Sequence, residues 1–202
     1  MLRCSARALK YSGLLAGGAA LGLWIAYVAT SAAQSKKDTQ PQTAAAAAPA
    51  GSNASPIYGV TIPPGYRDWR LIAVDQLVTD KVDQLRAQLG NDIAIKAFKD
   101  GTIPFPDGSI IAALHWTRVP SDENNKVLAG AFPGAKSYVI GSAVNVQLMV
   151  KDSKKYAATG GWGFADFKHG KPGDKALHET CFPCHEPAKA HDFVFAHYAP
   201  TP

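Results

Sequence analysis

Residues 143–151 read Ala-Val-Asn-Val-Gln-Leu-Met-Val-Lys, and two kinds of side chain alternate along them. On one face of an extended chain lie Val144, Val146, Leu148 and Val150, and on the other lie Asn145, Gln147 and Met149. A period of two residues is typical of a half-buried β-strand. This stretch therefore predicts a sheet with one apolar face.

The flanking segments extend this sheet. Further strands are expected over residues 70–74, 82–89, 110–118 and 162–167. Within 82–89, leucine and alanine alternate with glutamine and arginine, so that Arg86 points away from the apolar face. The Pro-Phe-Pro-Asp-Gly run at 104–108 predicts a turn between two of these elements.

A few helices complete the expected domain. Asn91 can cap a short helix over residues 92–100, and Gly101 can end it. Helices are also expected near 174–180 and again after His191. The combination predicts the α+β class: a mainly antiparallel sheet with a few flanking helices, one of which carries the C-terminal motif at residues 181–185.

The chain divides into three parts. Arg3, Arg7 and Lys10 precede an uncharged, largely apolar run, which is the order of an export signal cleaved after Ala33. The same segment, residues 1–33, is long enough to serve as an uncleaved membrane anchor. Residues 34–55 form an Ala/Pro/Gln linker, and residues 56–202 form one domain. Either reading of the first segment predicts a periplasmic domain, which is soluble or tethered to the inner membrane.

Composition narrows the possible classes of function. The 202 residues are 47% hydrophobic and carry a net charge of +5, of which the three basic residues before the apolar run supply +3. The remainder is too weakly basic for a nucleic-acid-binding protein, which concentrates Lys and Arg on one face. Three cysteines exclude a disulfide-dense scaffold.

Cys181-Phe182-Pro183-Cys184-His185 matches the C-x-x-C-H pattern of covalent c-type haem attachment. Two thiols three residues apart on a helical turn can reach the two vinyl groups of one porphyrin, and the adjacent imidazole can bind the iron. Cys181 and Cys184 are therefore the expected thioether residues. His185 is the expected proximal ligand of the iron.

Three other interpretations of these cysteines remain open. They could form a redox disulfide or a strained structural disulfide. They could also hold zinc together with His178 and His191, since this set has plausible Cys₂His₂ spacing. An optical spectrum separates these alternatives from haem.

Several motifs together resemble the cytochrome P-460 family. They are Tyr66-Arg67-Asp68-Trp69, Lys99-Asp100-Gly101, Phe105-Pro106-Asp107-Gly108, and Cys-His-Glu-Pro-Ala followed by Asp192-Phe193-Val194-Phe195. The resemblance covers residues 57 to 200. It implies an antiparallel sheet with the haem near the C-terminus, and a homodimer. Relatives include hydroxylamine-oxidising enzymes and beta-type cytochromes c-prime, which bind nitric oxide without turnover.

The resemblance also implies two features of the haem surroundings. Hydroxylamine-oxidising members carry a lysine cross-linked to the porphyrin, but the matching position here is Ala113, so the cross-link is not expected. Lys96 and Lys99, on the preceding helix, are expected in solvent. Arg86 aligns with an arginine of the distal pocket, where a guanidinium could donate hydrogen bonds to a bound ligand. The alternative for Arg86 is an exposed strand arginine.

The sixth position of the iron has few candidates. Met149 could bind there, but a single methionine on a strand is more often a core residue, and the resemblance predicts an open position. The other ligand candidates, each more often a core or surface histidine, are His115, His169, His178, His191 and His197. The aromatic side chains able to wall the pocket or to join the core are Phe98, Phe105, Trp116 and Phe132.

Two functions follow from these residues. The first is an exported cytochrome with one covalent haem c, which transfers electrons to a redox partner protein or binds nitric oxide. The second is an oxidoreductase that acts on hydroxylamine or a similar small nitrogen compound. Neither function involves nucleic acid, and contact with the membrane is expected only through the N-terminal segment.

Overall fold

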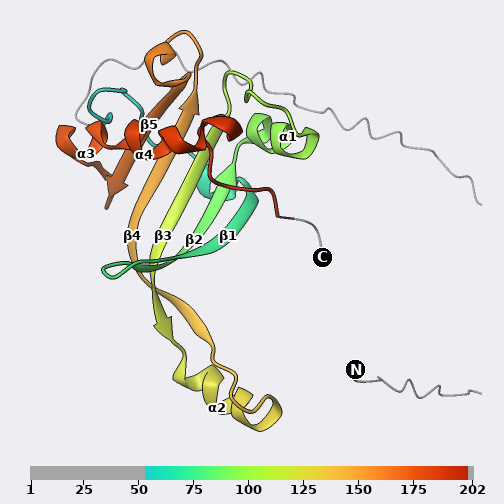
Figure 1. Ribbon diagram of the computed structural model, residues 1–202. Helices are drawn as coiled ribbons and strands as arrows, with labels where there is room; N and C mark the ends of the chain where they lie inside the picture. Colours follow the sequence, from blue (N-terminus) through green and yellow to red (C-terminus); the bar gives the residue numbers. More distant parts are fainter. Residues whose placement is uncertain (1–52, 200–202) are drawn as a thin grey trace, which may run out of the picture. The chain divides into compact units, whose positions relative to one another are not determined.

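The computed structural model describes residues 53–199, and its centre is a six-stranded antiparallel sheet. The strands are β1 (Arg70–Val78), β2 (Asp83–Gly90), β3 (Ile110–Pro120), β4 (Tyr138–Lys151), β5 (Trp162–Lys168) and β6 (Lys171–Pro172). Each strand pairs with its neighbours in sequence, so that the sheet is a simple meander (Figure 1). The expected export segment and nearly all of the expected linker lie outside the described residues.

Short helices surround the sheet. They are α1 (Asp92–Asp100), α2 (Asp122–Ala131), α3 (Lys175–Glu179), α4 (Cys181–His185) and the 3₁₀ helices η1 (Tyr66–Asp68), η2 (Ala157–Thr159) and η3 (Glu186–His191). This arrangement confirms the α+β prediction. No helix in residues 53–199 is both long and apolar enough to span a membrane.

Helix α1 has the predicted ends. The side chain of Asn91 accepts a hydrogen bond from the backbone N–H of Ala94, and Gly101 ends the helix with a φ of 64°. Asn91 also accepts from the N–H of Ile110 and donates to the carbonyl of Gly108. The same side chain therefore caps the helix and fixes the start of β3.

The sequence-based prediction was wrong in two places. No helix follows His191, because Asp192 and Phe193 adopt positive φ angles of 53° and 64° and end η3. Helix α2 was not predicted, since none of its residues is buried and it therefore lacks an apolar stripe. Its start is nevertheless capped by Ser121, which accepts from the N–H of Asn124.

The two faces of the sheet differ in chemistry. One face carries apolar side chains that occupy matching positions in β3, β4 and β5, namely Ala112, Leu114, Val146, Leu148, Ala165 and Phe167. The other, here called the polar face, carries Gln88, Ala113, His115, Asn145, Gln147 and Asp166, with Arg86 beside them on β2. The segment that contains α3, α4 and η3 crosses one end of the sheet (Figure 1).

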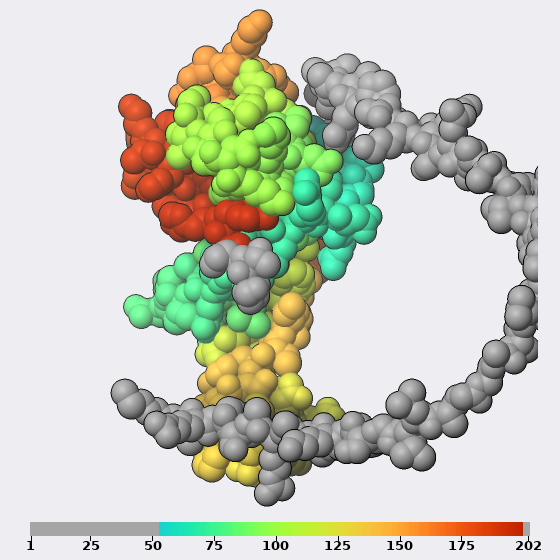
Figure 2. Space-filling model, turned by 90° about the vertical axis from the view of Figure 1, so that its right-hand side faces the viewer, coloured from blue at the N-terminus to red at the C-terminus, as the bar shows by residue number. Residues whose placement is uncertain are grey.

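Strands β3 and β4 continue beyond their neighbours as a two-stranded arm, defined as residues 118–140. In the arm Arg118 pairs with Ile140 and Pro120 with Tyr138, whereas β2 pairs with β3 only as far as Thr117. Helix α2 forms the tip of the arm, and Figure 2 shows this yellow part of the chain beyond the body of the domain.

Both ends of the described chain are bonded to the sheet. Ser55, the last residue of the expected linker, is buried and donates through its hydroxyl to the carbonyl of Phe164 at 3.2 Å. At the other end, the N–H of Ala199 donates to the carbonyl of Ile72 at 2.8 Å. One hydrogen bond near each end therefore ties the described chain to the sheet.

Candidate functional site

Helix α4 presents both thiols and the imidazole of the C-x-x-C-H motif from little more than one helical turn. It follows α3, whose first turn is capped by Asp174 through a hydrogen bond from the N–H of Leu177. Cys181 is half-buried, Cys184 is exposed, and neither is in a disulfide. The redox and structural disulfides considered from the sequence are therefore not formed.

The imidazole of His185 is fixed in orientation. Its Nδ1 donates to the carbonyl of Phe193 at 2.8 Å. The centroid of its ring lies 4.9 Å from that of the Phe164 ring and 5.1 Å from that of the Phe195 ring. Burial lowers the pKa of His185 below its ordinary value, against a smaller opposing effect of the hydrogen bond to Phe193. A neutral ring with its proton on Nδ1 keeps a lone pair on Nε2, which is the form that binds a metal.

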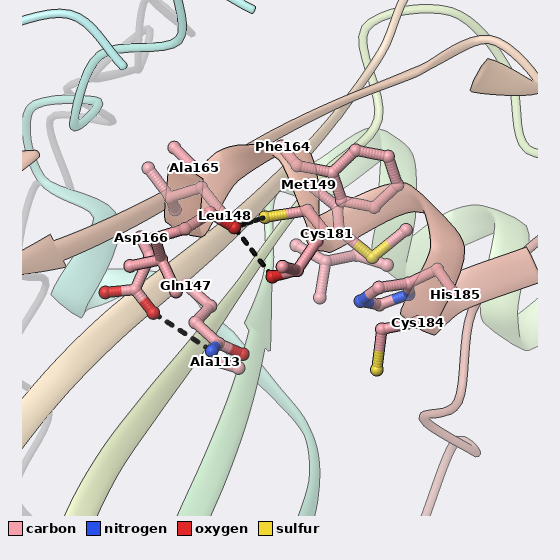
Figure 3. Close-up of a pocket in the computed structure, with 13 residues that line it drawn as sticks. Ala113, Gln147, Leu148, Met149, Phe164, Ala165, Asp166, Cys181, Cys184 and His185 are labelled. Atoms are coloured by element: carbon pink, nitrogen blue, oxygen red, sulfur yellow. Dashed lines mark hydrogen bonds between the residues drawn. The ribbon is translucent and has the colours of Figure 1, made fainter. Parts of the chain in front are cut away.

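A cavity of about 180 Å³, open to solvent, lies between α4 and the polar face (Figure 3). The wall formed by the helical segment includes Leu177, Thr180, Cys181, Cys184 and His185. The sheet contributes Ile111, Ala113, Gln147, Leu148, Met149, Phe164, Ala165 and Asp166. The lining is mostly apolar, as is usual for a site that binds an organic ligand.

Asp166 anchors the polar side of this cavity. Its carboxylate accepts from Asn145 at 2.6 Å and from Gln147 at 3.0 Å. Burial, with smaller contributions from Asp166 and Cys184, raises the pKa of the Cys181 thiol to about 11. Cys181 is therefore a protonated thiol at neutral pH.

Arg86 lies on the polar face but is not in the lining of the cavity. Its guanidinium donates to both oxygens of Asp75, at 2.6 and 2.8 Å, and Gln88 donates to the same carboxylate at 3.1 Å. The side chain is only 24% exposed, so Arg86 is not a fully exposed surface arginine. Because its guanidinium is paired with Asp75, it is not a free donor either. The direction predicted from strand periodicity is confirmed, whereas a distal role stays a prediction.

His115, directly opposite Arg86 in the register of β2 and β3, is 4% exposed. Its Nδ1 donates to the side-chain oxygen of Gln84 at 2.9 Å, and its buried Nε2 has no partner. Burial, and then the nearby Arg86, lower the pKa of His115 to about 4. The side-chain oxygens of Gln88 and Asn145 are also buried without a partner. Three adjacent strands thus place three unpaired acceptors on the polar face.

The family model for cytochrome P-460 matches residues 63–196. The chain belongs to the cytochrome P-460 family. This confirms the resemblance found in the sequence, and it identifies the protein as a haem-binding cytochrome. No curated protein matches the chain significantly.

The residues of this cytochrome P-460 family member fit a c-type haem. Two reduced cysteines and a histidine with a free Nε2 stand on one helix beside a mostly apolar cavity. In the cytochrome P-460 relatives that oxidise hydroxylamine, a lysine follows the Asp-Gly turn. Ala113, which is expected at that position from the sequence, lines the cavity, and no lysine is in the lining.

The other histidines do not form a metal centre. His178 is fully buried and both ring nitrogens are used: Nε2 accepts from the N–H of Asp166 and Nδ1 donates to the carbonyl of Asp174. His169 is exposed in the turn between β5 and β6, and His191 and His197 are exposed with ring centroids 5.8 Å apart. In residues 53–199 no group of three or more potential ligands is arranged to hold a metal ion. The zinc alternative is therefore not supported.

Met149 and Phe164 form one part of the cavity lining. They are paired across β4 and β5, and Phe164 packs against His185. Met149 is 8% exposed, which agrees with the interpretation as a core residue. Phe164 was not among the sequence candidates, because its place in the lining follows from the pairing of β5 with β4.

The aromatic residues predicted from the sequence lie elsewhere. Phe98 and Phe105 pack together at 4.9 Å, and Phe105 packs on Trp162. Trp116 is partly buried against the core, and Phe132 is 64% exposed near the end of α2. None of these predicted residues lines the cavity, so they are mainly core residues.

Proposed function

We propose that the protein is an exported c-type cytochrome with one haem attached through Cys181 and Cys184, and that it transfers electrons or binds nitric oxide. The observation that carries this proposal is the fixed imidazole of His185, whose lone pair is free beside both thiols. The haem, when bound, supplies an iron that changes oxidation state by one electron and binds a diatomic ligand.

The chain's own residues would have three tasks. Cys181 and Cys184 would hold the haem by adding their sulfur and thiol proton across its two vinyl groups, an addition that needs no oxidant. His185 donates the Nε2 lone pair to the iron. Phe164 and Met149 exclude water from the side of the imidazole on which they lie.

The missing lysine favours the non-catalytic function over turnover. Ala113 ends in a methyl group, which cannot form a bond to the porphyrin. We therefore expect an ordinary c-type spectrum, and a mature mass equal to that of the processed chain plus one haem. A mass showing an additional cross-link would contradict this expectation.

A second function, oxidation of hydroxylamine, is favoured by the unpaired acceptors on the polar face. Hydroxylamine has N–H and O–H groups that could donate to His115 Nε2, Gln88 and Asn145, whereas nitric oxide has none. The low pKa of His115 keeps Nε2 unprotonated at neutral pH, so that it can accept a hydrogen bond.

A steady-state assay decides between the two functions. Purified, haem-loaded protein is mixed with hydroxylamine and a one-electron acceptor, and His115→Gln is assayed beside it. We expect no turnover by the wild type, together with reversible binding of nitric oxide. Turnover that is lost in His115→Gln would establish the second function.

We also propose a periplasmic location, set by residues 1–33, and a homodimer. The arm supports the homodimer, because it exposes apolar side chains that nothing in residues 53–199 covers, among them Val127, Phe132, Val139 and Ile140. Such side chains are typical of a contact surface. A second copy of the chain is the partner that the family resemblance implies.

A further inference from the structure

A buried lysine, Lys151, is outside the cavity lining and bonds to the residue next to the one that accepts from the imidazole of His185. Lys151 is the last residue of β4 and its side chain is 4% exposed. Its ammonium donates to both carboxylate oxygens of Asp192 at 2.8 Å and to the carbonyl of Gly160 at 3.0 Å. Removal of either charge would leave the other buried without compensation, so this pair holds its two segments together.

Asp192 lies where the chain turns after η3. Asp192 and the following Phe193 both adopt left-handed backbone angles, which non-glycine residues keep only when their surroundings hold them. The carboxylate of Asp192 also accepts from the backbone N–H of Phe105 at 2.8 Å. With this residue fixed from two directions, the next carbonyl, that of Phe193, accepts the 2.8 Å hydrogen bond from His185.

Gly160 restrains Phe193 from a second side. A β-carbon at Gly160 would lie 2.1 Å from the ring of Phe193, so only glycine leaves room for that ring. Lys151 thus binds both the carbonyl of Gly160 and the carboxylate of Asp192. These two groups belong to the segments that enclose Phe193.

We propose that Lys151 is a positioning residue for the imidazole of His185, acting through Asp192 and the carbonyl of Phe193. The inference rests on the proposed function, in which His185 binds the haem iron. An acceptor held firmly at Nδ1 fixes the rotation of the ring and makes Nε2 a stronger donor to the metal. A stronger donor stabilises the oxidised iron and lowers the reduction potential.

The test is the haem-loaded double variant Lys151→Met, Asp192→Asn. It removes both charges, while asparagine still accepts from Phe105 and tolerates a positive φ. We expect a lower iron–histidine stretching frequency in the resonance Raman spectrum of the ferrous protein, and a higher reduction potential. We also expect exchange of the His185 Nδ1 proton to be about tenfold faster or more. The matched control is Lys96→Met, Asp100→Asn, which removes an exposed pair on α1 and should change none of these.

The outcomes separate the two proposals. A folded, haem-loaded double variant with the wild-type stretching frequency and potential would overturn the role of Lys151. Wild-type protein that lacks covalent haem would overturn the proposed function instead. If the double variant does not fold, Lys151→Arg, which keeps a cation paired with Asp192 but changes the length and shape of its head group, must shift the frequency and the potential in the same directions, and wild-type values there would overturn the role.

Discussion

The two thiols on α4 are the side chains on which the proposed cofactor depends. Cys181→Ala or Cys184→Ala should leave haem held by one thioether, and the double replacement should abolish covalent attachment. Denaturing electrophoresis followed by haem staining measures the attachment. Exposed Ser153→Ala is a suitable control, because its hydroxyl bonds only to Asp107, away from the cavity. Haem retained by the double variant would contradict the assignment.

His115 should make stability depend on pH. Its folded pKa of about 4 lies below the ordinary 6.5, so the unfolded chain binds a proton first as the pH falls. The free energy of unfolding contributed by this residue is therefore complete above pH 6.5 and is lost between 6.5 and 4. The loss should be on the order of 3 kcal/mol.

Urea unfolding at pH 7 and pH 4.5 measures this loss, and His115→Gln is the comparison. The variant should show a smaller decrease between the two pH values, since glutamine does not titrate. The other histidines are present in both proteins, so their contributions to the two decreases in the free energy of unfolding are equal. Equal decreases in the two proteins would show that folding does not lower the pKa of His115.

Helix α1 should depend on its cap more than α2 does. Asn91→Ala removes hydrogen bonds to Ala94, Ile110 and Gly108, two of which tie the helix to β3 and the turn before it. We expect a decrease in the free energy of unfolding of about 2 kcal/mol. Ser121→Ala, at the exposed cap of α2, should cost less than about 1 kcal/mol.

Urea midpoints compare these two caps directly. The difference is expected because α1 packs on β1, β2 and β3, whereas α2 buries no residue. An Asn91→Ala protein as stable as Ser121→Ala would show that the contacts of Asn91 with β3 are of little value.

These elements also show what the sequence could predict. Alternation in β4 and the capping residues of α1 act locally, so α1 was predicted with its observed bounds and β4 with its observed end at Lys151. The start of β4 at Tyr138, five residues before the predicted one, was missed. Helix α2 could not be predicted from an apolar stripe, because it lies on the arm and has none. The helix expected after His191 is absent since Lys151, distant in sequence, holds Asp192 in a left-handed conformation.

The candidate site divides in the same way. Cys181, Cys184 and His185 were predictable because one short motif contains all three. Phe164 and the pair of Lys151 with Asp192 were not, since their roles follow from the pairing of β4 with β5 and from a contact across 41 positions of the chain. Pairing between distant segments is a property of the folded domain, and local patterns do not report it.

The arm makes a prediction about the whole molecule. If a second copy covers it, Ile140→Glu should place a charge in the interface and convert a dimer to a monomer. Sedimentation equilibrium of the haem-loaded protein measures the mass. Val78→Glu, at an exposed valine on the body of the domain, is the control and should remain dimeric. A monomeric wild type, or an unaffected variant, would contradict the dimer through the arm.

The hydrogen bond from Ala199 to Ile72 has a consequence for biogenesis. Strands that pair in chain order can assemble as the polypeptide emerges, before the thiols are available. The tail residue Ala199 follows the cysteines in the chain, so it can bond to β1 only after they have been synthesised. The last residue that lines the cavity, His185, precedes Ala199, so the cavity walls and the bond that ties the tail to β1 are both completed only when the end of the domain has been synthesised.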